Sequence, residues 1–93
     1  MSNDNGILLM LRRIVMNTVI VYTQPSCPPC EFTKLYLKNH NISFEEKNIA
    51  TNPKAKKEMM NKYNAFSTPV IVINEEAIIG FDQERIEQLL GKA

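Results

Sequence analysis

The sequence is poor in several features that would have pointed to other classes of protein. It has only two cysteines, one histidine and no apolar stretch longer than five residues. Its formal net charge of +1 gives no reason to expect nucleic acid or an anionic membrane as a partner. The low cysteine count and the lack of a secretory framework favour a reducing compartment, so we expect a cytoplasmic protein.

The apolar stretch at residues 7–11 does not have the properties of a targeting or membrane segment. A helix that spans a bilayer needs about 20 apolar residues. A signal peptide carries its positive charge before the apolar run, whereas here Asp4 precedes the run and Arg12 and Arg13 follow it. We therefore expect a soluble intracellular protein that does not bind membranes.

A chain of 93 residues has room for one small domain. We expect this domain to span residues 16–93, because Met16 is a second plausible start, and residues 1–15 to be an N-terminal extension. Two interpretations of the extension remain open. It is either a disordered segment or artefact that comes from an upstream start codon, or a short helix or edge strand that packs on the domain.

The patterns of apolar residues and of capping residues predict alternating strands and helices. The predicted elements are a strand at 18–23, a helix at 28–39, a strand at 42–49, a helix at 53–63, strands at 70–73 and 77–79, and a helix between Asp82 and Gly91. The helical crossover makes the first two strands parallel, and the short connection makes the last two a hairpin. The fold class is therefore α/β, with one four-stranded mixed sheet (β-α-β-α-β-β-α) and helices on both faces.

The first predicted helix has apolar residues at helical spacing. Its apolar face is predicted to contain Phe32, Leu35, Tyr36 and Asn39.

The stretch Cys27-Pro28-Pro29-Cys30 carries the chemistry. A disulfide that closes so short a loop stabilises a fold only slightly, so the pair is more plausibly functional than structural. Cys27 lies at a predicted helix N-terminus, where free N–H groups and the helix dipole stabilise a thiolate. We therefore assign Cys27 as the nucleophile and Cys30, one turn further on, as the resolving thiol. Pro28 and Pro29 remove two of those N–H groups.

Two alternatives to a redox pair are possible for these cysteines. A C-x-x-C pair can also supply two of the four ligands of a zinc site. Such a site needs two more ligands, and His40 is the one further candidate. Two buried, inert cysteines are the other alternative. We expect no metal site and no tightly bound cofactor.

Four motifs in order resemble those of the glutaredoxin family. They are Val19-Ile20-Val21-Tyr22-Thr23, Cys27-Pro28-Pro29-Cys30, Ser67-Thr68-Pro69-Val70 and Gly80-Phe81-Asp82, and the resemblance covers residues 17–91. It implies a thioredoxin-like fold, a cis peptide bond at Pro69, and thiol–disulfide exchange with electrons from glutathione or from a reductase.

The resemblance also implies a substrate-binding surface beside Cys27. Its residues are expected to be Thr68, Pro69, Phe81, Asp82 and Gln24. Phe81 has an alternative role, as an apolar residue that packs beside a helix cap. The chain departs from the family's common pattern, which has a tyrosine at Pro29, a second glycine at Phe81 and a basic residue near Gln24.

The Gly80-Phe81 pair is similar to small glutaredoxin-like proteins that take electrons from thioredoxin reductase. The electron donor, glutathione or thioredoxin reductase, therefore stays open. The function we expect is that of a monomeric thiol–disulfide oxidoreductase that reduces protein disulfides or glutathione mixed disulfides through Cys27 and Cys30. A dimer that holds an iron–sulfur cluster and a redox-sensing interaction module are the alternatives.

Overall fold

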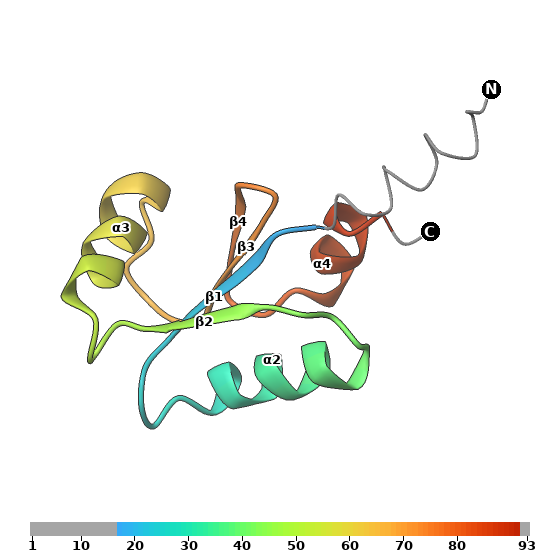
Figure 1. Cartoon of the computed structure of the whole chain (residues 1–93), viewed down its shortest axis with the longest axis horizontal. Helices are drawn as coiled ribbons and strands as arrows, with labels where there is room; N and C mark the ends of the chain where they lie inside the picture. Colours follow the sequence, from blue (N-terminus) through green and yellow to red (C-terminus); the bar gives the residue numbers. More distant parts are fainter. Residues whose placement is uncertain (1–16, 92–93) are drawn as a thin grey trace.

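The computed structural model describes residues 17–91, which form a four-stranded sheet with three helices (Figure 1). In chain order the elements are β1 (Val19–Thr23), α2 (Pro28–Asn39), β2 (Glu45–Asn48), α3 (Pro53–Tyr63), β3 (Val70–Ile73), β4 (Glu76–Ile79) and α4 (Gln83–Leu89). The predicted α/β class and element order are confirmed. The predictions for residues 1–15 and for a domain start at Met16 lie outside the described residues.

The strands have the order β2-β1-β3-β4. The pair β1 and β2 is parallel, as expected from the helical crossover, and the other two pairs are antiparallel. The β3–β4 hairpin turns on Asn74 and Glu75, whose φ angles of 49° and 74° suit a two-residue turn. Because the turn is this tight, β4 begins at Glu76, one residue earlier than predicted.

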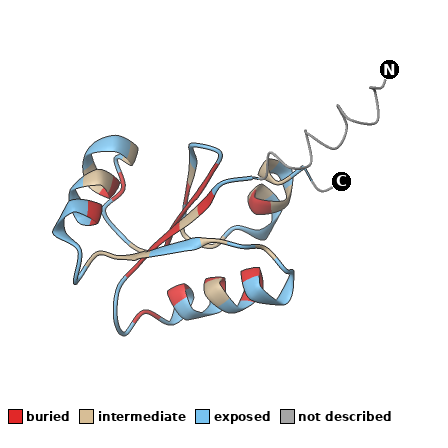
Figure 2. Ribbon diagram, viewed as in Figure 1, coloured by how far each residue is buried: buried red, intermediate tan, exposed pale blue. Residues whose placement is uncertain are grey.

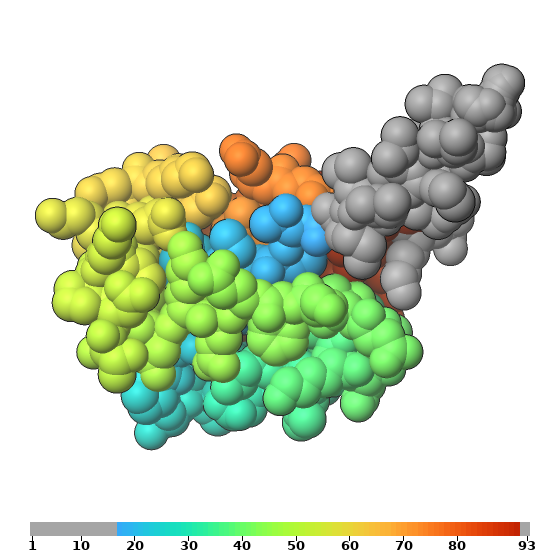
Figure 3. Space-filling model, viewed as in Figure 1, coloured from blue at the N-terminus to red at the C-terminus, as the bar shows by residue number. Residues whose placement is uncertain are grey.

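The two faces of the sheet are covered by different helices. Val19 and Val21 of β1 pack in one core cluster with residues of α2 and α4, whereas Tyr22 packs in a second cluster with α3. Figure 1 shows α2 and α3 on opposite sides of the sheet, and Figure 3 shows their side chains separated by the band that β2 forms. Side chains of a strand alternate between its faces, so consecutive residues of β1 serve different helices.

Each helix begins at the residue that the sequence predicts as its cap. Cys27, Asn52 and Asp82 have extended backbone, and the side chain of each accepts a hydrogen bond from an amide three residues later. Such caps stabilise a helix by about 1 kcal/mol. His40 lies at the C-terminal end of α2, as expected. The local sequence therefore fixes where α2 starts, and with it the position of the cysteines.

The predicted apolar face of α2 is partly wrong. Phe32 and Leu35 are 55% and 57% exposed, whereas Leu37, which the prediction placed off this face, is fully buried. The buried side chains of α2 are those of Cys30, Thr33, Tyr36 and Leu37. Figure 2 shows that the buried residues of the helix lie on the side that faces the sheet. The buried face is rotated relative to the predicted one because Cys30 is buried. Thr33 and Leu37, three and seven positions later, lie on the same side of the helix and are buried with it.

The strand predicted at 42–49 is shorter in the structure. Pairing with β1 covers only Glu45–Asn48. Ile42 and Phe44 precede the strand and pack against the core from a loop. None of the helices within residues 17–91 has the length and apolar composition that crossing a bilayer requires.

Candidate active site

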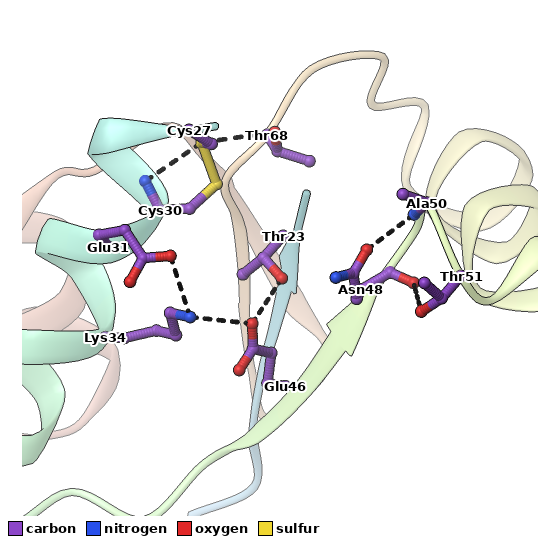
Figure 4. Close-up of polar contacts among 10 residues, drawn as sticks. All are labelled: Thr23, Cys27, Cys30, Glu31, Lys34, Glu46, Asn48, Ala50, Thr51 and Thr68. Atoms are coloured by element: carbon purple, nitrogen blue, oxygen red, sulfur yellow. Dashed lines mark hydrogen bonds and ion pairs between the residues drawn. A yellow bond between two sulfur atoms is a disulfide. The ribbon is translucent and has the colours of Figure 1, made fainter. Parts of the chain in front are cut away.

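Cys27 and Cys30 form a disulfide at the start of α2 (Figure 4). The two sulfur-bearing residues differ in accessibility, since Cys27 is 8% exposed and Cys30 is fully buried. A reagent that approaches from solvent therefore reaches Cys27 first. This asymmetry agrees with the roles that the sequence predicts for the two thiols.

The start of α2 aims one backbone amide at the Cys27 sulfur. Pro28 and Pro29 occupy the first two helical positions and have no N–H group, so the amide of Cys30 is the first that the helix offers. It donates to Cys27 Sγ at 3.2 Å. The next amide, of Glu31, donates to the Cys27 carbonyl oxygen at 3.1 Å. The two prolines thus leave one N–H group on the sulfur, which stabilises negative charge there.

The loop before β3 lies against the same sulfur. The Thr68–Pro69 peptide bond is cis, so the prediction that rested on the resemblance is confirmed. Thr68 Oγ1 is 3.7 Å from Cys27 Sγ. Pro69 is buried, and Thr68 is half-buried beside the disulfide. The structure therefore brings together two segments that are about forty residues apart in the sequence.

The segment before α4 is hydrogen-bonded through its backbone to the loop that carries Thr68 and Pro69. The Gly80 amide donates to the Pro69 carbonyl oxygen at 2.8 Å. Phe81 is partly buried, and its ring packs edge-on against Phe32 and Tyr36 of α2, with centroid distances of 4.9 and 5.1 Å. Phe81 therefore packs on α2, and its role in binding substrate stays a prediction.

Two of the predicted binding residues, Asp82 and Gln24, lie at the surface. Asp82 is exposed and accepts a hydrogen bond from the Arg85 amide as the cap of α4. Gln24 is exposed in the loop between β1 and α2, three residues before Cys27. Their contact with a substrate stays a prediction. Within residues 17–91, no group of three His, Cys, Asp or Glu side chains is arranged to hold a metal ion.

Sequence reasoning missed a polar network that lies beside the disulfide (Figure 4). The Thr23 hydroxyl donates to Glu46 at 2.7 Å, and the Lys34 ammonium contacts Glu46 at 3.1 Å and Glu31 at 3.2 Å. The Thr23 hydroxyl, followed by Lys34, lowers the pKa of the Glu46 carboxyl. Glu46 in turn raises the pKa of Lys34 through their hydrogen bond. We call Thr23, Glu31, Lys34 and Glu46 the charged network.

One signal for this network was present in the sequence. Lys34 follows Cys30 by four residues, which is one helical turn, so the two share a side of α2. Nothing local, however, indicated that Glu46 would meet Lys34. Their contact depends on the parallel pairing of β2 with β1, which places Glu46 opposite Val21.

Comparison with known proteins identifies the same family as the sequence motifs. The family model for glutaredoxin matches residues 19–78. A glutaredoxin-like 8.6 kDa protein of Clostridium pasteurianum, encoded in a rubredoxin operon, is 39% identical over 72 residues, which cover 77% of this chain and 96% of the relative.

Solved structures match the fold over most of the chain. The thioredoxin-like protein BC3987 is 40% identical with a TM-score of 0.75, covering 78% of this chain and 100% of the other. The glutaredoxin-like NrdH-redoxin of Escherichia coli, described as having a thioredoxin-like activity profile, is 26% identical with a TM-score of 0.68, covering 77% and 93%. The expected thioredoxin-like fold is confirmed.

Proposed function

Because this chain belongs to the glutaredoxin family of thiol oxidoreductases, we propose that it reduces disulfides through Cys27 and Cys30. The observation that carries the proposal is the disulfide between Cys27, which keeps 8% of its surface exposed, and the fully buried Cys30, with the Cys30 amide directed at the Cys27 sulfur. That arrangement suits Cys27 as the attacking thiolate.

The proposed reaction has two exchange steps. The Cys27 thiolate attacks a substrate disulfide, forms a mixed disulfide and releases the first substrate sulfur as a thiolate, which takes up a proton. Cys30 then loses its proton and attacks the Cys27 sulfur, which releases the second substrate thiolate and leaves the Cys27–Cys30 disulfide. Two electrons pass from the protein to the substrate. A donor dithiol, or two thiols, returns them by the reverse sequence.

We also propose that protein disulfides, rather than glutathione mixed disulfides, are the preferred substrates. Glutathione carries two carboxylates and a net negative charge, and residues 24–31, 66–69 and 79–82 around the disulfide contain no lysine or arginine to pair with them. The nearby Lys34 is already paired with Glu31 and Glu46. The charged side chains in these segments are the carboxylates of Glu31 and Asp82.

Exposed apolar side chains near the disulfide favour the same substrate class. Phe66 is 75% exposed two residues before Thr68, and Phe32 is 55% exposed two residues after Cys30. These two aromatic side chains would offer apolar contacts to a protein substrate. By the same reasoning we propose that the electron donor is a protein dithiol of the thioredoxin reductase class. The cluster-binding dimer and the redox-sensing module stay predictions.

Two cysteine variants test the reaction. In Cys27→Ser, turnover of a protein disulfide such as insulin should fall to the background rate. In Cys30→Ser, the first exchange should still occur, so a mixed disulfide with the substrate should accumulate and be visible by mass spectrometry. Full activity in Cys27→Ser would refute the assignment of the nucleophile.

A second assay tests the donor. The oxidised protein is mixed with NADPH and either thioredoxin reductase or glutathione with glutathione reductase, and NADPH oxidation is followed. We expect faster reduction by thioredoxin reductase. Faster reduction by the glutathione system would contradict the proposed donor while leaving the dithiol chemistry intact.

A further inference from the structure

The charged network has a counterpart on the opposite face of the sheet. There the Tyr22 hydroxyl donates to Glu58, and Lys47 contacts the same carboxylate at 3.0 Å. The side chains of Lys34 and Glu46 are 19% and 37% exposed, and those of Lys47 and Glu58 are 22% and 36% exposed. The two networks therefore have nearly the same chemistry and accessibility. They differ in their distance from the cysteines, because the sheet separates the second network from α2.

Helix geometry places Lys34 close to Cys30. Residues four apart on an α-helix have Cβ atoms about 6 Å apart. Helical side chains also lean toward the helix N-terminus, which directs Lys34 toward the turn that carries the cysteine. Cys30 and Thr23 are almost completely buried, so on this side the cysteine is surrounded by protein atoms rather than by solvent. Charges interact more strongly across such a medium than across solvent.

The charges of the network do not cancel. Lys34 contributes one positive charge, and it contacts two carboxylates, Glu31 and Glu46. The charge next to Cys30 is therefore −1, with Lys38 a more distant positive contributor to the field at Glu46. Glu46 is the better shielded of the two carboxylates, since its side chain is 37% exposed and that of Glu31 is 65% exposed. Solvent weakens the influence of Glu31 more than that of Glu46.

From this arrangement we propose that Glu46 is a positioning residue for the dithiol: by neutralising Lys34 it holds the reduction potential of the Cys27–Cys30 pair low. Without Glu46, Lys34 would keep only the more exposed Glu31 as its partner, and the charge beside Cys30 would change from −1 to zero, which would make a thiolate in the reduced pair more stable. Stabilising the reduced form makes a dithiol pair more oxidising. With Glu46 in place, the reduced protein gives up its electrons more readily. The inference rests on the proposed dithiol–disulfide cycle and adds to it the residue that sets its driving force.

The test measures the midpoint potential of the full chain at equilibrium with dithiothreitol redox buffers. Replacing Glu46 with glutamine should change the equilibrium constant with dithiothreitol about threefold, or about 15 mV at 30 mV per tenfold, toward a less negative potential. Lys34→Gln should change it by a similar factor toward a more negative potential. The double variant should lie close to the wild type because both charges are gone.

Three controls separate charge from structure. Lys34→Arg keeps the charge and should keep the potential. Glu58→Gln removes the matching carboxylate on the far face and should also leave the potential unchanged. Thiol acidity, followed by ultraviolet absorbance of the thiolate as pH rises, should increase in Glu46→Gln and decrease in Lys34→Gln.

The outcomes distinguish this inference from the proposed function. Shifts of the same sign in Glu46→Gln and Lys34→Gln, or no shift in either, overturn the role of Glu46 although the protein still cycles with the redox buffer. A protein that does not cycle between dithiol and disulfide fails the proposed function itself. If Glu46→Gln does not fold, Lys34→Gln decides alone: a more negative potential supports the inference, and an unchanged or less negative one overturns it.

Discussion

Tyr22 and Thr23 are neighbours in β1, yet their hydroxyl groups serve two different faces of the sheet. Each donates to a carboxylate that a lysine also contacts, Glu58 for Tyr22 and Glu46 for Thr23. The first arrangement ties α3 to the sheet, and the second lies beside the disulfide. The two arrangements are alike in chemistry and differ in what lies next to them, because only α2 carries the cysteines.

The largest expected effects come from removing the side chain that anchors each helix. Leu37 of α2 and Met59 of α3 are 0% and 1% exposed, and replacing either with alanine should lower the free energy of unfolding by about 2–5 kcal/mol. Denaturant unfolding measures this loss. Only Leu37→Ala should also change the reduction potential, because it loosens the helix that holds Cys30. If Met59→Ala changed the reduction potential by as much as Leu37→Ala, the two faces would not differ in their influence on the dithiol.

The next effect concerns the hydroxyl on the α3 face. Tyr22→Phe leaves the Glu58 carboxylate with Lys47 as its remaining described partner. Hydrogen bonds to charged groups contribute about 1.5–3 kcal/mol, and the partial exposure of Glu58 places the expected loss at about 1.5 kcal/mol. Thermal or denaturant unfolding measures it. The midpoint potential should equal that of the wild type, and a changed potential would show that the far face also influences the dithiol.

The carboxylates of both networks should make the free energy of unfolding depend on pH. The pKa of Glu58 is lowered first by the Tyr22 hydroxyl and then by Lys47, and that of Glu46 is lowered by Thr23 and Lys34. A carboxyl with a lowered folded-state pKa stabilises the fold above its unfolded-state pKa. This stabilisation is lost as pH falls through the folded-state pKa, so unfolding should become easier below about pH 4.

At high pH a tyrosine on each face should affect stability, because burial and Glu87 also raise the pKa of Tyr36 on the α2 face. Burial, and then the hydrogen bond to Glu58, raise the pKa of Tyr22 well above its ordinary value. A raised pKa stabilises the fold below the unfolded-state value of about 10, and this stabilisation is lost as pH rises through the folded-state value. Denaturation midpoints measured from pH 3 to 11 should therefore fall at the alkaline end in the wild type and less steeply in Tyr22→Phe. Equal slopes would contradict the assignment to Tyr22.

The smallest effect serves as a reference for both faces. Arg85 and Glu76 form an ion pair whose side chains are 41% and 57% exposed. Exposed pairs stabilise proteins by at most about 1 kcal/mol, so Arg85→Gln should change the unfolding free energy by less than that and leave the potential unchanged. A larger loss would show that exposure is a poor guide to the strength of the other two lysine–carboxylate pairs.

The sequence was sufficient to place the cysteines because the relevant signals are local. The buried strand, the cap at Cys27 and the prolines after it act within a few residues, and the helix begins where they predict. The Asn52 and Asp82 caps were found for the same reason. The apolar face of α2 was partly wrong because spacing alone does not say which of two apolar stripes meets the sheet.

What the sequence by itself determined is the chemistry: a pair of thiols at a strand end and a helix start, with Cys27 at the helix N-terminus. What only the tertiary structure decided is the environment of that pair. The Gly80–Pro69 hydrogen bond and the meeting of Glu46 with Lys34 join segments that are separated in the chain. Such contacts depend on strand register and helix packing, which involve the whole fold, and no local pattern in the sequence encodes them.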